Sequence, residues 1–107
     1  MMDYIFIKKG NILFKIRLVE IDWINSEKNY CTVVSNGKKY PLKTSLRKII
    51  AQLPKEDFFQ IHKSYIVRLD NIESIDIATN KLIIKNTPLP LGRSFKVELL
   101  KKLDFLK

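Results

Sequence analysis

The sequence predicts a mainly β domain with two short helices, over about residues 45–53 and 94–106. Runs rich in β-branched and aromatic residues recur along the chain, and turn dipeptides such as Gly10-Asn11 and Asn36-Gly37 separate them. Only two stretches place apolar residues at helical spacing. With 107 residues, 46% hydrophobic and 29% charged, the chain has the length and composition of one globular domain.

The first part of the chain alternates short strands with polar connections. A hairpin around Gly10-Asn11 opens it, and its second strand alternates apolar with basic residues, which predicts one buried face. The expected segments are strands over 4–9, 12–17 and 18–23, a polar connection over 25–30, and a strand over 31–34. Trp23 is expected to anchor the core because its neighbours are apolar.

The middle of the chain combines a hairpin with the first helix. Asn36-Gly37 is the strongest hairpin signal, because both residues tolerate positive φ, and Pro41 predicts that the following strand lies at a sheet edge. Thr44 or Ser45 can then cap a helix that Pro54 stops.

The last part contains two more hairpin strands and the second helix. A strand over 72–77, a turn at Thr79-Asn80 and a strand over 82–84 lead to a second turn at Asn86-Thr87. The prolines in 88–92 place that segment at a sheet edge, since they donate no ladder hydrogen bond. Ser94 is expected to cap the final helix.

Basic residues outnumber acidic ones. There are 20 Lys and Arg against 11 Asp and Glu, which gives a formal net charge of +9 and a pI near 9.7. Residues 1–53 hold ten basic and four acidic side chains, net +6, and residues 54–107 hold ten and seven, net +3. The spread-out excess favours a polyanionic partner, of which nucleic acid is the commonest. Simple solubility also explains charge taken alone.

Catalytic and metal-binding patterns are absent from the sequence. His62, the only histidine, has no neighbouring cysteine or carboxylate at metal-ligand spacing, and the single Cys31 excludes an internal disulfide and a zinc finger. Cys31, His62 and Asp70 could meet as a nucleophilic triad, but no flanking sequence supports it. We expect no enzyme, metal or cofactor, and a structural role for His62.

Apolar runs in the sequence fall short of the roughly 20 residues that a membrane span needs, and no signal peptide opens the chain. We therefore expect a cytoplasmic protein. Residues 1–107 are expected to form a single domain, which could come from a longer protein.

The segment 59–71 is the centre of the candidate site. Its apolar residues can anchor it to a core, while Lys63, Ser64 and Arg68 offer donors of the kind that contact phosphates and base edges. Lys28 and Tyr30 fall at the predicted polar tip. At this tip, the local sequence fits a recognition loop and an ordinary solvated hairpin loop equally well.

These blocks resemble a known family. Residues 59–72, FQIHKSYIVRLDNI, resemble the central signature of LytTR-type DNA-binding domains. Residues 24–30, INSEKNY, are similar to that family's loop before its middle strand, and Thr44-Ser45-Leu46 with Leu53-Pro54 resembles the helix that follows. Residues 88–95, PLPLGRSF, are similar to its terminal segment with its arginine. Several ordered blocks carry more weight than any one alone.

The resemblance implies an elongated antiparallel β domain whose loops enter successive major grooves of double-stranded DNA. Family members usually follow a receiver domain in bacterial two-component response regulators and bind paired half-sites, so a dimer on DNA is implied. The family's base-reading positions fall on Tyr30, Lys63 and Arg93. The implied phosphate contacts are Lys28, Ser64, Ser94, Lys96 and Arg68.

Two positions depart from the family pattern. The family usually has asparagine where this chain has Arg68, and more often arginine where it has Lys63. Lysine lacks the planar fork of arginine, so discrimination between bases is expected to be looser at Lys63. Arg68 fits either a phosphate contact or a surface ion pair.

Sequence-specific DNA binding for transcription regulation is the function that these features favour. The rival is a protein-interaction module whose basic surface meets an acidic partner, since the charge and the exposed edge segments suit both. Single-stranded RNA binding is less favoured, because exposed aromatic residues are sparse among the basic positions.

Overall fold

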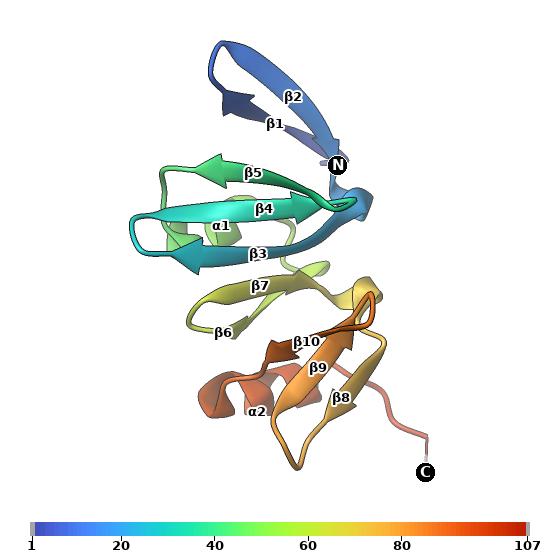
Figure 1. Cartoon of the computed structure of the whole chain (residues 1–107). Helices are drawn as coiled ribbons and strands as arrows, with labels where there is room; N and C mark the ends of the chain where they lie inside the picture. Colours follow the sequence, from blue (N-terminus) through green and yellow to red (C-terminus); the bar gives the residue numbers. More distant parts are fainter. Residues whose placement is uncertain (1, 107) are drawn as a thin grey trace.

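The computed structural model describes residues 2–106, so Met1 and Lys107, the ends of the predicted domain, lie outside the described part. It confirms the mainly β class with two α-helices, and its extents of 50 × 31 × 25 Å make it elongated (Figure 1). The strands are β1 (Tyr4–Lys9), β2 (Ile12–Arg17), β3 (Ile21–Glu27), β4 (Tyr30–Ser35), β5 (Lys38–Leu42), β6 (Phe58–His62), β7 (Tyr65–Arg68), β8 (Ser74–Asp76), β9 (Lys81–Ile84) and β10 (Thr87–Pro90), and the helices are α1 (Leu46–Gln52) and α2 (Arg93–Lys101).

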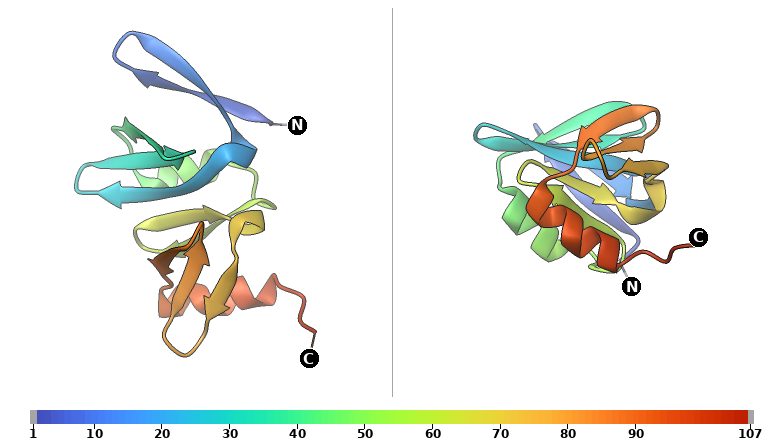
Figure 2. Two further views of the ribbon diagram at one scale, coloured as in Figure 1. Left: turned by 45° about the vertical axis from the view of Figure 1, so that its right-hand side comes forward. Right: turned by 90° about the horizontal axis from the view of Figure 1, so that it is seen from below.

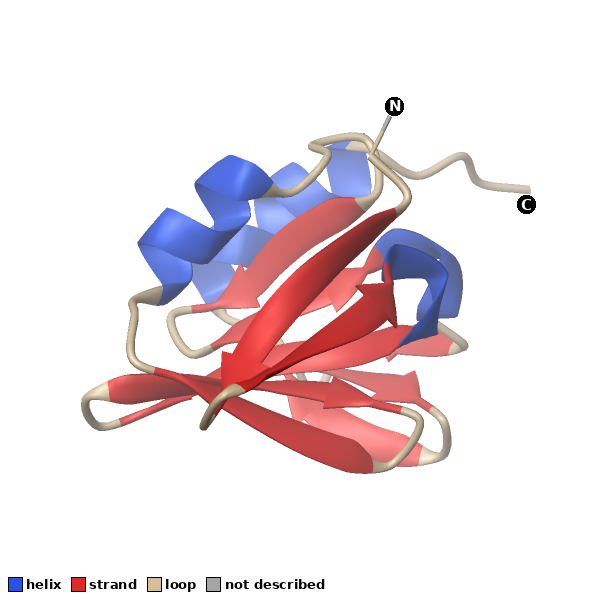
Figure 3. Cartoon of the chain, turned by 90° about the horizontal axis from the view of Figure 1, so that it is seen from above, coloured by secondary structure: helices blue, strands red, loops and turns tan. Residues whose placement is uncertain are grey.

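Three antiparallel sheets follow one another along the long axis. A five-stranded sheet of order β5-β4-β3-β7-β6 lies between the β1–β2 hairpin and a three-stranded sheet of order β10-β9-β8 (Figure 2). Both α-helices lie on the same side of the sheets (Figure 3). Pro41 lies in β5, an edge strand, and β10 is an edge strand as well, as the prolines predict.

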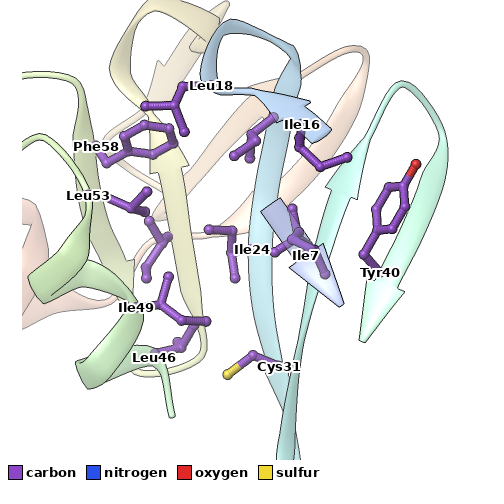
Figure 4. Close-up of a cluster of buried hydrophobic side chains, with 13 residues drawn as sticks. Ile7, Ile16, Leu18, Ile24, Cys31, Tyr40, Leu46, Ile49, Leu53 and Phe58 are labelled. Carbon is purple, nitrogen blue, oxygen red and sulfur yellow. The ribbon is translucent and has the colours of Figure 1, made fainter. Parts of the chain in front are cut away.

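The five-stranded sheet separates two hydrophobic cores. Neighbouring residues in its central strands face opposite sides, so that Ile24 and Ile66 join the first core while Trp23 and Val67 belong with the second. Trp23 is partly buried and packs against the second core, which agrees with its predicted role as an anchor. The buried residues of the first core are Ile7, Ile16, Leu18, Ile21, Ile24, Cys31, Val33, Tyr40, Leu46, Ile49, Leu53, Phe58 and Ile66 (Figure 4). Those of the second are Ile61, Val67, Leu82, Ile84, Leu89, Leu91 and Leu99.

Paired positive φ values mark two of the hairpin turns. Asn36 and Gly37 have φ of 51° and 79°, as the dipeptide predicts. The second turn of the last sheet is formed by Lys85 and Asn86, with φ of 48° and 61°, and not by Asn86-Thr87. Thr87 pairs with Ile84 instead, so the hairpin register moves the turn one residue towards the N-terminus.

The strand β3 differs from its prediction at both ends. Leu18–Glu20 form a 3₁₀ turn, and the strand then runs on through Asn25, Ser26 and Glu27, where a polar loop was expected. Its polar end is held by ladders on both sides, because Asn25 pairs with both Thr32 and Tyr65. Tertiary pairing here outweighs the low β propensity of these residues. The predicted strand over 72–77 is shorter, with β8 covering 74–76 and Ile77 59% exposed.

The two helices agree with their predictions in place but not in every boundary. Ser45 caps α1, and its hydroxyl accepts a hydrogen bond from the Lys48 amide at 3.2 Å. Gly92 and not Ser94 is the N-cap of α2, and that helix ends at Lys101 instead of about 106. Beyond it, Leu106 is fully exposed, so no core stabilises another turn.

None of the helices described is long and apolar enough to cross a membrane.

Candidate nucleic-acid interface

The three segments that carry the predicted base-reading residues lie along one edge of the molecule. The tips of the β3–β4 and β6–β7 hairpins and the start of α2 are on the same side in Figure 1 and in the turned view of Figure 2. Both hairpins have two-residue tips, because Glu27 pairs with Tyr30 and His62 pairs with Tyr65. Lys28 occupies its tip at φ 51°.

A backbone hydrogen bond joins the two hairpin tips. The Ser26 amide donates to the Ser64 carbonyl at 2.9 Å, just beyond the last paired residues of β3 and β7. The tips carrying Tyr30 and Lys63 are thus fixed relative to one another by the sheet and not only by their own turns.

His62 braces the second tip from inside. Its Nδ1 accepts a hydrogen bond from the Ser64 amide at 3.0 Å, and its ring packs edge-on against Tyr65 at 5.9 Å between centroids. The Gln60 amide donates to the His62 carbonyl at 3.1 Å. These contacts confirm the predicted structural role of His62 and leave Lys63, at the top of the turn, exposed.

Gly92 places the start of α2 against the same hairpin. Its amide donates to the Ile61 carbonyl at 2.7 Å. A Cβ at this position would lie 3.6 Å from the His62 Cα and 2.9 Å from the Phe95 ring, which is closer than a side chain tolerates. The absence of a side chain therefore lets Arg93 follow directly beside β6.

A groove of about 500 Å³ connects the two hairpin tips to the start of α1. Lys28, Tyr30 and Lys63 line it together with Arg47, whose side chain is exposed. Arg47 is not among the phosphate contacts that the family resemblance implies. Nothing in the local sequence shows that the first turn of α1 lies beside the two tips, so this fourth residue escaped prediction.

Tyr30 is 40% exposed and has an acidic neighbour. Its hydroxyl donates to Glu27 Oε2 at 3.4 Å, while the Asn25 side chain donates to Glu27 Oε1 at 3.2 Å. In the free protein, the Tyr30 hydroxyl is thus held in a hydrogen bond to the Glu27 carboxylate. A DNA base would have to displace this carboxylate to accept a hydrogen bond from the hydroxyl.

Lys96 and Ser94 differ in how freely they can reach a partner. The Lys96 ammonium donates to the Ile77 carbonyl at 3.1 Å and to Asn80 Oδ1 at 2.7 Å, which ties α2 to the β8–β9 turn. Since an ammonium has three donors, one remains. Ser94 is exposed at the second position of α2, beside Arg93.

Arg68 lies away from the other candidate residues. It is at the far end of β7 from the Lys63-Ser64 tip, and its side chain is only 13% exposed. Its guanidinium pairs with Asp70 at 3.5 Å and stacks 5.9 Å from the Phe58 ring centroid. The structure thus shows the ion pair that was one of its two expected roles.

Comparison with known proteins identifies the family. The sequence profile of the LytTr DNA-binding domain matches residues 11–104. The chain belongs to the LytTR DNA-binding domain family. This confirms the resemblance seen in the sequence, and it makes the chain a DNA-binding domain from a family that is not catalytic.

This LytTR domain is similar to two further proteins, one in structure and one in sequence. A solved chain from Bacillus cereus, described as the LytTr DNA-binding domain of a methyl-accepting/DNA response regulator, has the same fold. Its TM-score is 0.84 at 21% identity, over 98% of this chain and 100% of that one. An uncharacterised response regulatory protein of Vibrio cholerae is 28% identical over 71 residues, which are 63% of this chain. The match spans 27% of that relative's length.

The residues of the conceivable catalytic triad have other partners in this LytTR domain. Cys31 is buried, its thiol donates to the Thr44 carbonyl at 3.2 Å, and burial raises the pKa of that thiol. His62 is engaged with Ser64, and Asp70 with Arg68. Within residues 2–106, no three His, Cys, Asp or Glu side chains gather where they could hold a metal ion.

Proposed function

We propose that this domain binds double-stranded DNA sequence-specifically to regulate transcription, with its recognition segments entering successive major grooves. The observation that carries the proposal is the alignment of the two hairpin tips and the start of α2 along one edge. Successive major grooves on one side of B-DNA are about 34 Å apart. A domain 50 Å long can therefore reach both.

The proposed base contacts follow from the chemistry of the three side chains. Arg93 can form a bidentate bond with the N7 and O6 acceptors of guanine. Lys63 can donate to the same acceptors as a point charge, with less geometric selectivity. Tyr30 can exchange its hydrogen bond to Glu27 for one to a base, or pack against a thymine methyl.

Phosphate contacts would fix the register of the domain on DNA. Lys28 and Ser64 lie in the two hairpin tips, and Ser94 lies where the first amides of α2 favour an anion. The groove supports adding Arg47 to this set. Lys96 would contribute only its third donor, and we assign Arg68 to its ion pair instead.

Assembly and cellular context are part of the proposal. We infer that the domain acts in the bacterial cytoplasm as the output part of a two-component response regulator and binds paired half-sites as a dimer. The length of the Vibrio cholerae relative supports a larger parent protein. A receiver domain would then precede residues 1–107, which form a single domain.

Selection of bound duplexes from a random pool, at physiological salt, tests the proposal. We expect enrichment of a short motif, repeated at a spacing near one helical turn of about 10.5 base pairs. The same selection with Lys63→Ala should relax one position of the motif and leave the others. Failure to enrich any sequence would contradict specific recognition and favour the acidic-protein partner.

A further inference from the structure

The outer face of the β1–β2 hairpin exposes large apolar side chains. Residues paired across an antiparallel ladder share a face, so Tyr4, Phe6 and Leu13 point the same way. They are 47%, 57% and 62% exposed. Met2 and Val19, which lie just outside the two strands, are 44% and 52% exposed. We call these residues, with the cations between them, the hairpin face.

Three cations alternate with these apolar groups. The pairing sets Arg17 opposite Tyr4, Lys15 opposite Phe6, and Lys8 opposite Leu13. The Lys15 ammonium lies 4.3 Å from the Tyr4 ring centroid, and the Tyr4 and Phe6 rings meet edge to face at 5.8 Å. None of the eight positions of the hairpin face carries a carboxylate.

Neither folding nor the DNA-binding edge accounts for this face. The opposite side of the hairpin provides the packing, with Ile7 and Ile16 buried in the first core. The hairpin is at the end of the molecule away from α2 (Figure 1). The whole of β1, with its aromatic residues, lies outside residues 11–104, which match the family profile. Contiguous exposed apolar groups of this kind mark interaction surfaces.

We propose that the hairpin face docks a protein surface that presents carboxylates around an apolar patch. The three cations favour an anionic partner, and DNA would match them but leave the apolar side chains without a complementary surface. A second copy of the chain would set cations against cations. An acidic, partly apolar protein surface can pair with the cations and cover the apolar side chains at the same time.

Phage display of random short peptides against the chain tests this proposal. A parallel selection uses the Phe6→Ser/Leu13→Ser double variant as the counter-target. Both side chains are mostly exposed, so this variant should fold. We expect the peptides that discriminate between the two proteins to combine Asp or Glu with Leu, Phe or Trp. Enrichment of basic peptides, or no peptide that depends on the hairpin, would overturn the proposal.

Charge reversal then tests the electrostatic part on one selected peptide. By fluorescence anisotropy, Lys15→Glu/Arg17→Glu should lower its affinity about tenfold, and added salt should weaken the wild-type complex. Lys38→Glu/Lys39→Glu, the same charge reversal at two exposed residues of β5 outside the hairpin face, is the matched control and should change the affinity much less. If reversal on the hairpin face lowered the affinity for random duplex DNA, or for anionic lipid vesicles, tenfold more than this control does, the face would belong to those partners and the proposal would be contradicted.

Discussion

Arg93 offers the sharpest test at the scale of one side chain. It is exposed at the first position of α2, and none of the ion pairs among residues 2–106 involves it. Arg93→Ala should cost about 1–3 kcal/mol on the selected site and much less on random duplex, because it removes a bidentate base contact. Mobility-shift titrations on both duplexes measure the difference.

Arg93→Lys separates charge from shape at the same position. It keeps the charge but loses the planar fork, so it should retain non-specific affinity and lose discrimination. Equal losses on selected and random duplex for Arg93→Ala would show that the residue contacts only the backbone.

Cys31 predicts a pH dependence of stability. Burial raises its pKa in the folded chain, so the folded state holds the thiol proton more tightly than the unfolded state. The resulting stabilisation is present below the unfolded pKa, about 8.5, and is lost as the pH rises through the folded value. Urea unfolding should therefore show a steeper alkaline loss of stability for the wild type than for Cys31→Ala. Parallel profiles would contradict the prediction.

Gly92 connects two elements, and its substitution tests whether their contact sets specificity. Gly92→Ala brings a Cβ within 2.9 Å of the Phe95 ring, so the ring or the start of α2 must shift. The unfolding free energy should fall by about 1–3 kcal/mol, as for other overpacked sites. Discrimination between selected and random duplex should fall as well, since Arg93 moves relative to Lys63. Gly37→Ala is the control for stability loss away from the site: its Cβ meets open space, but φ at Gly37 is 79°, so the variant should lose stability through turn strain and keep its discrimination between duplexes.

At the scale of elements, the sequence predicted correctly those turns and caps that depend on a few adjacent residues. The Asn36-Gly37 turn and the Ser45 cap depend on a few adjacent residues, and both appear where the sequence places them. The polar end of β3 and the end of α2 depend instead on distant partners, namely the strands beside Asn25 and the lack of a core near Leu106. Neither signal is local.

The residues of the candidate site also fall into two groups: those that the sequence indicated and those that only the three-dimensional contacts show. Tyr30, Lys63 and Arg93 came from a resemblance that preserves the order of segments, and the fold brings these segments to one edge. Their roles on DNA stay predictions. Arg47 and the occupied state of Lys96 required three-dimensional contacts, because the residues that surround them are far away in sequence.

At the scale of the molecule, an ion pair joins the last sheet to the central one. The Lys85 ammonium lies 2.8 Å from Asp22 Oδ1, and the Asp22 side chain is only 5% exposed. Lys85→Met keeps the aliphatic stem but leaves the buried carboxylate unpaired, so the unfolding free energy should fall by about 1–3 kcal/mol. Urea denaturation measures this change. The double variant with Asp22→Asn should recover part of the loss, and no recovery would mean that the pair is not the cause.

The overall charge of +9 makes DNA affinity depend on salt, and Arg47 tests how much of that dependence belongs to the groove. The logarithm of affinity should fall with the logarithm of salt concentration by about 0.9 per neutralised phosphate. Arg47→Ala should therefore make the slope shallower by about 1 and weaken all sequences similarly. Lys48→Ala removes the same charge from the next residue of α1, which does not line the groove, and should leave the slope nearly unchanged. If both variants changed the slope equally, net charge alone would explain the effect, and Arg47 would have no specific phosphate contact.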